Sequence, residues 1–296
     1  MENSILHIGY PKTGTTWFQK KFYPNISDIE FYDHHKLKAI IGDYKNRTEA
    51  SQTKSVFNNC KKRIVVCDEN MIGNAMHFNE NAAYFKKVFG PCQVVIFLRN
   101  QLEKFASNYS EYIKAGGTDS VKRFLFTKGD ELYGGSKHLY HNLIETYINA
   151  FGRDNIHVFL FEAFRENPVR FVHNYNEKLK LDFNSNALKF TAVNPKFSGA
   201  LLKLRRISNL FTKKQAEWLN SRPRPKKYYF HIPYWYEFSY IILNKLSYFS
   251  NPSPNAYKKV LGEENLEYIH HYFCNSNRIL IDKYGLTNII KYNYPL

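Results

Sequence analysis

The sequence is poor in cysteine, and its four cysteines, Cys60, Cys67, Cys92 and Cys274, are scattered over 296 residues. Their number and spacing exclude the disulfide framework of a small secreted domain, and no Cys-x-x-Cys pair predicts a zinc site. We therefore expect reduced thiols in a reducing compartment. A chain of this length can bury a sizeable core without such cross-links.

Long apolar runs are also missing, since no window approaches the roughly 18–20 apolar residues that a membrane-spanning helix needs. Met1 runs directly into the first apolar segment, without the basic region and small-residue cleavage site of a secretory leader. These absences predict a cytoplasmic protein. A peripheral contact at the inner face of the membrane stays open, because of the C-terminal third described below.

Acidic residues are scarce: 26 Asp and Glu stand against 42 Lys and Arg, which gives a formal charge of +16. Such a surface attracts polyanions, among them nucleic acid, acidic glycans, anionic lipid and multiply charged nucleotides. Charge alone does not choose among these ligands. It leaves a non-enzymatic polyanion-binding protein as one alternative function.

Short apolar runs alternate with amphipathic segments along the first part of the chain. The runs predict strands at 5–9, 63–67, 93–99 and 155–161, and the segments predict helices at 15–22, 79–89, 102–115 and 168–179. This alternation predicts a P-loop-like three-layer α/β/α fold with a central parallel sheet. In one domain of residues 1–296, we expect a cofactor-binding core at 1–183 and a helical and irregular extension at 184–296.

Ligands of parallel sheets bind beyond the carboxyl ends of the strands. The segments 9–16, 68–73 and 99–107 each follow a predicted strand. We therefore expect these three segments to converge on one crevice.

The first of these segments has the glycine spacing of a phosphate-binding loop. Gly9 and Gly14 punctuate a strand-to-helix turn, whose backbone N–H groups can bind phosphate oxygens. In a Walker A loop a lysine follows the second glycine, but here Thr15 occupies that position and Lys12 lies at the apex. A P-loop kinase or NTPase remains an alternative, with Asp68 as its metal-binding acid.

The stretch "YPKTGTTW" closely resembles the 5'-phosphosulfate loop of the sulfotransferases that use 3'-phosphoadenosine 5'-phosphosulfate (PAPS). The resemblance implies that Lys12 contacts the bridging oxygen of the phosphosulfate. A cation there would neutralise the charge that develops on the leaving group, with no metal needed. The further cofactor contacts that the resemblance implies are Thr13, Gly14, Thr15, Thr16 and Trp17.

A second motif, "VVIFLRNQLEKFASNYSEY", resembles the 3'-phosphate site of the same family. There an arginine at a strand end is followed eight positions later by a serine, which implies roles for Arg99 and Ser107. Arginine offers a planar fork of donors that suits a phosphate dianion. Downstream of the loop motif, this pair strengthens the resemblance to sulfotransferases.

The third segment, "DEN" after the strand at 63–67, supplies candidates for the base that removes the acceptor's proton. It is similar to the "SEN"-like segment of bacterial and glycan-type sulfotransferases, which implies Glu69 as the base. Asp68 is the alternative, and either carboxylate could instead cap the following turn.

The Lys-Thr-His segment of the small-molecule branch is absent from the sequence. We therefore expect a hydroxyl-bearing glycan or glycolipid as acceptor, in place of a phenol or steroid, and no nucleic-acid partner.

Later matches to the family are weaker. A tyrosine-bearing helix implies Tyr140 as an adenine contact, and "VNPKFSG" is the nearest analogue of the loop that closes over the 3'-phosphate, with Lys196 and Ser198 as candidates. The resemblance covers roughly the first 180 residues. The basic run at 203–227 and the aromatic stretch after it predict an acidic-acceptor surface, a peripheral membrane contact, or a helical subdomain that completes the core or forms a homodimer.

Overall fold

The computed structural model describes residues 4–42, 48–126, 131–183, 198–221, 229–248 and 255–296. The chain forms two compact units. Unit 1 comprises Met1–Arg99, Leu139–Thr191 and Ser276–Tyr292, and unit 2 comprises Asn100–His138, Ala192–Asn275 and Asn293–Leu296. Each unit contains residues from both sides of residue 183, so the units do not correspond to the expected parts 1–183 and 184–296. That division into a cofactor-binding core and an extension stays a prediction.

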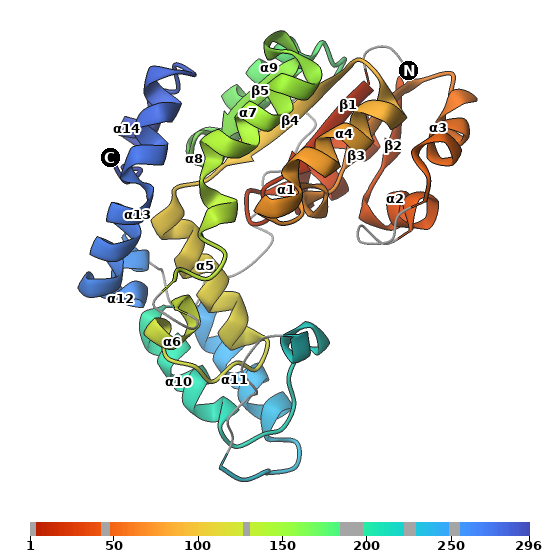
Figure 1. The fold of residues 1–296 in the computed structure, drawn as a ribbon. Coiled ribbons are helices and arrows are strands. Elements are labelled where there is room, and N and C mark those ends of the chain that lie inside the picture. Colours follow the sequence, from red (N-terminus) through yellow and green to blue (C-terminus); the bar gives the residue numbers. More distant parts are fainter. Residues whose placement is uncertain (1–3, 43–47, 127–130, 184–197, 222–228, 249–254) are drawn as a thin grey trace. The chain divides into compact units, whose positions relative to one another are not determined.

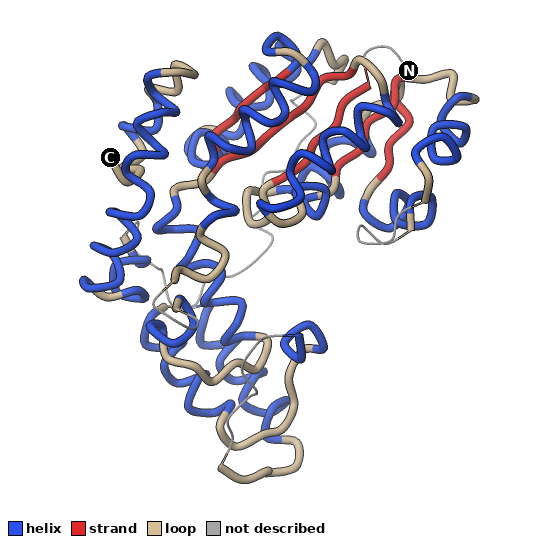
Figure 2. The backbone as a smooth tube through the Cα atoms, viewed as in Figure 1, coloured by secondary structure: helices blue, strands red, loops and turns tan. Residues whose placement is uncertain are grey.

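Among the described residues, unit 1 holds a five-stranded parallel sheet with the order β2-β3-β1-β4-β5 (Figure 1, Figure 2). Its strands are β1 Ser4–Gly9, β2 Ile29–Tyr32, β3 Arg63–Cys67, β4 Cys92–Leu98 and β5 Ile156–Leu160. Its helices include α1 Thr15–Trp17, η1 Phe18–Phe22, α2 His34–Ile41, α3 Ala50–Asn58, η3 Glu69–Ile72, α4 Phe78–Phe89, α7 Tyr140–Phe151, α8 Phe161–Glu166, α9 Pro168–Leu179 and α14 Asn288–Lys291.

The strands form because their apolar side chains are buried on both faces of the sheet. All six residues of β1 are buried, as are the last five of β4. Parallel strands buried on both faces are near-continuous apolar runs, which is the pattern seen in the sequence. The predicted three-layer fold and its four strands are confirmed. The fifth strand, β2, was not predicted, because it is only four residues long and carries the charged Glu30.

Helices cover both faces of this sheet. On one face α4 and α7 pack side by side, with α7 against β4 (Figure 1). On the other face the helices after the loop and after β5 pack an aromatic cluster against β1 and β4, which includes Phe18, Phe97, Phe171 and Tyr175. These ring contacts account for much of the high aromatic content of the first 180 residues.

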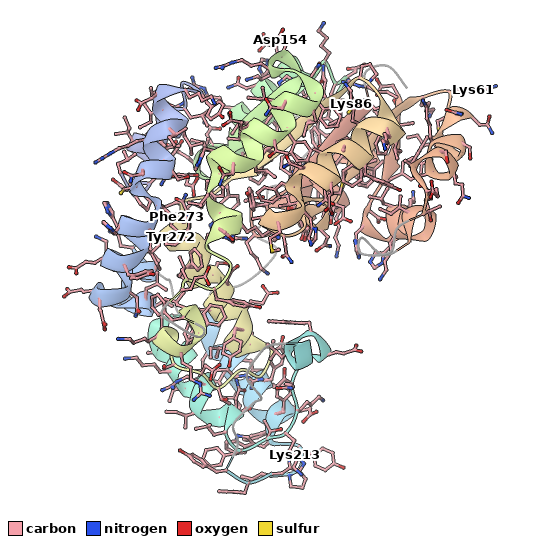
Figure 3. The ribbon with its side chains drawn as sticks, viewed as in Figure 1. Lys61, Lys86, Asp154, Lys213, Tyr272 and Phe273 are labelled. Atoms are coloured by element: carbon pink, nitrogen blue, oxygen red, sulfur yellow. The ribbon has the colours of Figure 1, made fainter. Side chains whose placement is uncertain are left out.

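Unit 2 is helical in its described part. It contains α5 Gln101–Lys114, α6 Val121–Leu125, α10 Gly199–Asn209, α11 Trp235–Tyr248, α12 Ala256–Leu261 and part of α13 Glu263–Asp282. The Asn209 amide ties α10 to α5, since it donates to the carbonyls of Ile113 and Gly117 at 2.8 Å each. Tyr272 and Phe273 of α13, labelled in Figure 3, make an edge-to-face pair.

The basic side chains of the protein do not all lie on its surface. Lys61 and Lys213 are exposed (Figure 3), whereas Arg205, in the basic run of the sequence, is fully buried. Its guanidinium lies over the ring of Tyr236 at 4.5 Å and donates to Ser239 Oγ at 2.8 Å. The basic run is therefore not one continuous exposed surface. Its residues 222–227 lie outside the described ranges.

Candidate active site

The loop between β1 and α1 has the backbone of an anion-binding turn. Gly9, Lys12 and Gly14 all have positive φ angles, of 112°, 67° and 85°. Gly14 ends the loop in the left-handed region, and the helical segment that starts at Thr15 has no side-chain cap. Alternating backbone conformations of this kind turn successive N–H groups toward one point, where an anion can bind. The Lys12 side chain is exposed at the apex.

The threonines of the loop differ in their surroundings. The hydroxyls of the buried Thr13 and Thr15 both donate to the carbonyl of Tyr10, Thr15 at 3.4 Å. They hold the turn closed, so the predicted contacts of these residues with the cofactor fall to their backbone N–H groups. Thr16 is half-buried. Trp17 is 5% exposed within the aromatic core, so its indole supports the loop from below.

Gly9 allows η3 to approach the loop closely. A Cβ at this position would lie 3.0 Å from Glu69 Cα and 3.2 Å from Glu69 Cβ. We expect Gly9→Ala to lower the free energy of unfolding by about 1–3 kcal/mol, since Ala is strained at this φ and displaces Glu69. Gly90→Ala is the matched control, because Gly90 also has a positive φ and has no atom within 4 Å of the added Cβ. Urea denaturation showing equal losses in the two variants would contradict the close approach.

Glu69 lies beside the loop in a half-buried position. Burial raises the pKa of its carboxyl, and the nearby Lys12 ammonium acts in the opposite direction. The Gln19 amide donates to the Cys67 carbonyl at 2.9 Å and to Glu69 Oε2 at 3.4 Å, which orients the carboxylate. This combination suits a general base, because a raised pKa strengthens the carboxylate as a proton acceptor.

Asp68 has a structural position. Its side chain is fully buried, and Oδ1 accepts from the backbone N–H of Asn70 at 2.9 Å, which caps η3. Oδ2 lies 2.8 Å from Nδ1 of His34. These partners engage both carboxylate oxygens, which favours Glu69 over Asp68 as the proton acceptor.

Arg99 follows β4 and reaches the loop apex. Its guanidinium donates through Nη1 to the Lys12 carbonyl at 2.9 Å and stacks on the Phe161 ring at 4.9 Å. The side chain is 7% exposed. Within unit 1 the loop, η3 and the residue that ends β4 thus meet at the carboxyl edge of the sheet, where sequence order predicted a crevice.

Tyr140 has a different position from the one predicted for an adenine contact. Its ring is fully buried in an edge-to-face pair with Tyr10 at 4.9 Å. Its hydroxyl donates to the Arg99 carbonyl at 2.6 Å. The prediction is corrected, because a ring enclosed in this way has no exposed face on which adenine could stack. Tyr140 instead holds the end of β4.

The remaining predicted contacts lie in the other unit or outside the described ranges. Ser107 is half-buried on α5 in unit 2. Ser198 caps α10, where its hydroxyl accepts from the N–H of Leu201 at 3.3 Å. Lys196 lies outside the described residues. The assignment of Ser107 stays a prediction from the sequence.

Two residues of the site were missed by sequence reasoning. Gln19 orients Glu69, and His34 holds Asp68, but both act from segments that are distant in the sequence from the residues they hold. The only signal for Gln19 was its position four residues after Thr15, which places it one helical turn further on the same side. Nothing in the sequence pointed to His34, which precedes no motif and begins a short helix.

A phosphate loop after the first strand, with a carboxylate and an arginine at the neighbouring strand ends, fits a nucleotide-dependent transferase with an α/β core. The sulfotransferase domain family matches residues 2–227, so the chain belongs to this family. It is a sulfotransferase of the class that takes its sulfuryl group from PAPS.

Two solved structures are similar to the chain. Mouse sulfotransferase SULT7A1 complexed with PAP is 14% identical, with a TM-score of 0.50 over 99% of this chain and 88% of that one. A sulfotransferase from Alicyclobacillus acidocaldarius is 17% identical, with a TM-score of 0.49 over 64% of this chain and 87% of that one. No curated protein matches the chain.

Two structural findings concern metals and membranes. Within the described ranges, no group of three or more His, Cys, Asp or Glu side chains could hold a metal ion. In the same ranges every helix is too short or too polar to cross a bilayer. Transfer without a metal stays a prediction from the loop motif.

Proposed function

We propose that this sulfotransferase moves a sulfuryl group from PAPS to a hydroxyl of a glycan, a glycolipid or a similar polar acceptor. The observation that carries the proposal is that Glu69 lies against the loop at Gly9, while Lys12 is at the apex of the same loop. Lys12 is exposed at the apex, and Glu69 is half-buried beside the loop, where burial raises the pKa of its carboxyl. This is the arrangement that in-line transfer to a hydroxyl requires, with a cation for the leaving group and a base for the nucleophile.

The proposed roles follow from this geometry. Glu69 takes the proton of the acceptor hydroxyl as its oxygen forms the new bond to sulfur. The bond between sulfur and the bridging oxygen breaks, and the 3'-phosphoadenosine 5'-phosphate (PAP) product leaves with the electron pair. Lys12 stabilises the charge on that oxygen, and Gln19 keeps Glu69 aligned. The backbone N–H groups from Thr13 to Thr16 bind the 5'-phosphate, with Thr16 adding its hydroxyl. The N–H of Trp17 donates to the Gly14 carbonyl at 2.8 Å, so Trp17 supports the loop and does not bind the phosphate through its N–H.

We assign the 3'-phosphate to Arg99 and, from the sequence pattern alone, to Ser107. The hydrogen bond from the Arg99 guanidinium to the Lys12 carbonyl places the positive charge of Arg99 beside the loop. We expect Arg99→Ala to weaken PAP binding by about 10- to 100-fold, since it removes charge-assisted hydrogen bonds. Calorimetric titration measures this change, and the exposed Arg170 provides a matched control as Arg170→Ala. Equal affinities in the two variants would contradict the role of Arg99.

The acceptor class is supported by the sequence more than by the site. The chain lacks the histidine segment of enzymes that sulfate phenols, and its charge of +16 favours polar or acidic acceptors. We propose a cytoplasmic enzyme that works on a precursor or at the inner face of the membrane. The exposed side chains of Phe238, Ile241 and Leu246 on α11 would contact the lipid, and a homodimer interface is the alternative use of this surface.

A transfer assay with PAPS tests the acceptor class. The panel contains neutral and acidic oligosaccharides, a glycolipid, a phenol and a steroid alcohol. We expect turnover with at least one glycan or glycolipid and none with the phenol or the steroid. Turnover confined to the phenol or the steroid would contradict the proposed acceptor.

A further inference from the structure

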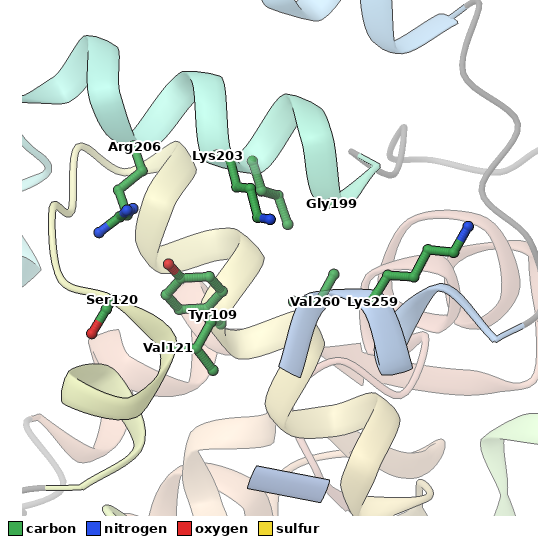
Figure 4. Close-up of a pocket in the computed structure, with 9 residues that line it drawn as sticks. Tyr109, Ser120, Val121, Gly199, Lys203, Arg206, Lys259 and Val260 are labelled. Atoms are coloured by element: carbon green, nitrogen blue, oxygen red, sulfur yellow. The ribbon is translucent and has the colours of Figure 1, made fainter. Parts of the chain in front are cut away.

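Unit 2 contains a small cavity between four of its helices (Figure 4). Its volume is about 170 Å³, which is below the roughly 300–1,000 Å³ of pockets that take whole drug-sized ligands. It suits one end of a small molecule. The lining residues are Tyr109 of α5, Ser120 and Val121 at the start of α6, Gly199, Leu202, Lys203 and Arg206 of α10, and Lys259 and Val260 of α12.

The cavity is lined by three cations, Lys203, Arg206 and Lys259. Lys203 and Arg206 extend from α10 toward Tyr109 and Ser120 (Figure 4), and Lys259 stands at the α12 side. In the part of the chain that the structure describes, none of these three cations has a carboxylate partner.

Two acids close in sequence to this wall, Asp119 and Glu264, are paired with other cations. Asp119 Oδ1 forms an ion pair with Arg123 Nε at 2.9 Å, and Glu264 accepts from Lys122 at 2.7 Å. Asp119 and Glu264 are therefore engaged by the cations of α6, and within the described ranges they are not partners of Lys203 or Arg206 on α10. An anion bound in the cavity would supply the missing charge.

The polar groups in the wall are compatible with an anion. The Tyr109 hydroxyl donates to the Asp119 carbonyl at 3.1 Å, and burial raises the pKa of Tyr109 to about 12, against the opposing effect of Arg206. Tyr109 is therefore neutral at neutral pH and adds no negative charge. The Ser120 oxygen accepts from the N–H of Arg123 at 3.3 Å, which leaves its hydroxyl hydrogen for a ligand oxygen.

The rest of the wall is apolar. Val121, Leu202 and Val260 face the cavity beside the ring of Tyr109. An inorganic ion would leave this surface in contact with water, whereas an organic ligand that carries the charge at one end would cover it. Charge and apolar surface together define the ligand chemistry.

We propose that this cavity binds the acid group of a small organic ligand, as a carboxylate, a sulfate ester or a phosphate ester. The cavity is distinct from the predicted 3'-phosphate contact, because Tyr109 and Ser107 are two residues apart on α5 and so point to nearly opposite sides of the helix. The ligand can be an acidic sugar, which includes the acceptor itself, or a free inorganic anion. Both kinds of ligand carry the same negatively charged group, and the test below distinguishes between them.

The test is calorimetric titration of the full chain with glucuronate, glucose 6-sulfate, inorganic sulfate and neutral glucose. Chloride keeps the ionic strength constant, since salt screens exposed charges. Each titration is run with and without saturating PAP. A signal that survives saturation comes from outside the nucleotide site, and the variants test whether it comes from the cavity. The variants are Arg206→Ala and Lys203→Ala. Lys258→Ala removes the same charge from an exposed position of α12 outside the cavity.

We expect the acidic sugars to bind and glucose not to bind. Arg206→Ala and Lys203→Ala should each weaken binding by about tenfold or more, because each removes a charge-assisted contact. Lys258→Ala should change it by less than about twofold. Tighter binding of inorganic sulfate than of the sugars would identify a free anion as the ligand. The proposal is overturned if no acidic probe binds, or if all three variants weaken binding equally while their melting curves stay unchanged.

Discussion

Lys12→Ala is expected to lower the rate of sulfuryl transfer by about 10²–10³-fold, the effect of removing one preorganised group that stabilises transition-state charge. The fold should survive, because the Lys12 side chain is exposed. Its backbone carbonyl, which the substitution keeps, is the atom that Arg99 holds. The loop should therefore retain its shape while it loses the cation at its apex.

Single-turnover kinetics with PAPS measures this change. Lys20→Ala is the matched control, since Lys20 is an exposed lysine eight residues further along, in the helical segment that follows the loop. The control should keep transfer close to the wild-type rate. If Lys12→Ala transfers sulfuryl groups as fast as Lys20→Ala, Lys12 has no role at the leaving group.

Glu69→Gln is expected to lower the transfer rate by about 10²–10⁴-fold, the range for loss of a general base. PAP binding should change little, because the amide keeps the shape of the side chain and can still meet Gln19. Asp68→Asn should show the opposite pattern. It mainly lowers thermal stability, since it weakens a buried contact with His34, and it leaves a measurable transfer rate.

The pH dependence gives a second measure of Glu69. A base acts only when it is deprotonated, so activity should fall as the pH falls through the pKa of Glu69. Burial raises that pKa, so the loss should begin at a higher pH than an ordinary glutamate would give. The acidic limb of kcat/KM should vanish in Glu69→Gln. An unchanged limb in that variant, or its loss in Asp68→Asn instead, would assign the base elsewhere.

The sheet could be predicted from the sequence because its strands are buried on both faces, which leaves uninterrupted apolar runs such as 64–67 and 94–98. It was sufficient for the loop because positive φ angles at 9 and 14 require glycine there, so the backbone geometry is visible in the residue types. β2 could not be predicted, because a strand of four residues that includes a charged side chain is too short to show a hydrophobic periodicity.

Burial and tertiary partners could not be predicted in the same way. Tyr140 matched a family pattern, but whether its ring faces the ligand or the core depends on Tyr10, a residue 130 positions away in the sequence. Arg205 stood in a basic run and is nonetheless buried under Tyr236. The choice between Asp68 and Glu69 needed His34 and Gln19, whose positions depend on how the helices pack on the sheet.

The most direct test of the central claim is calorimetric titration of the wild-type chain with PAP, ADP and ATP, each with and without magnesium. The three nucleotides separate the 3'-phosphate from the 5'-phosphate chain. Our account predicts that PAP binds most tightly, that ADP binds at least about tenfold more weakly for lack of the 3'-phosphate, and that magnesium changes neither affinity. Tightest binding of ATP, and only with magnesium, would contradict it and indicate a P-loop kinase or NTPase.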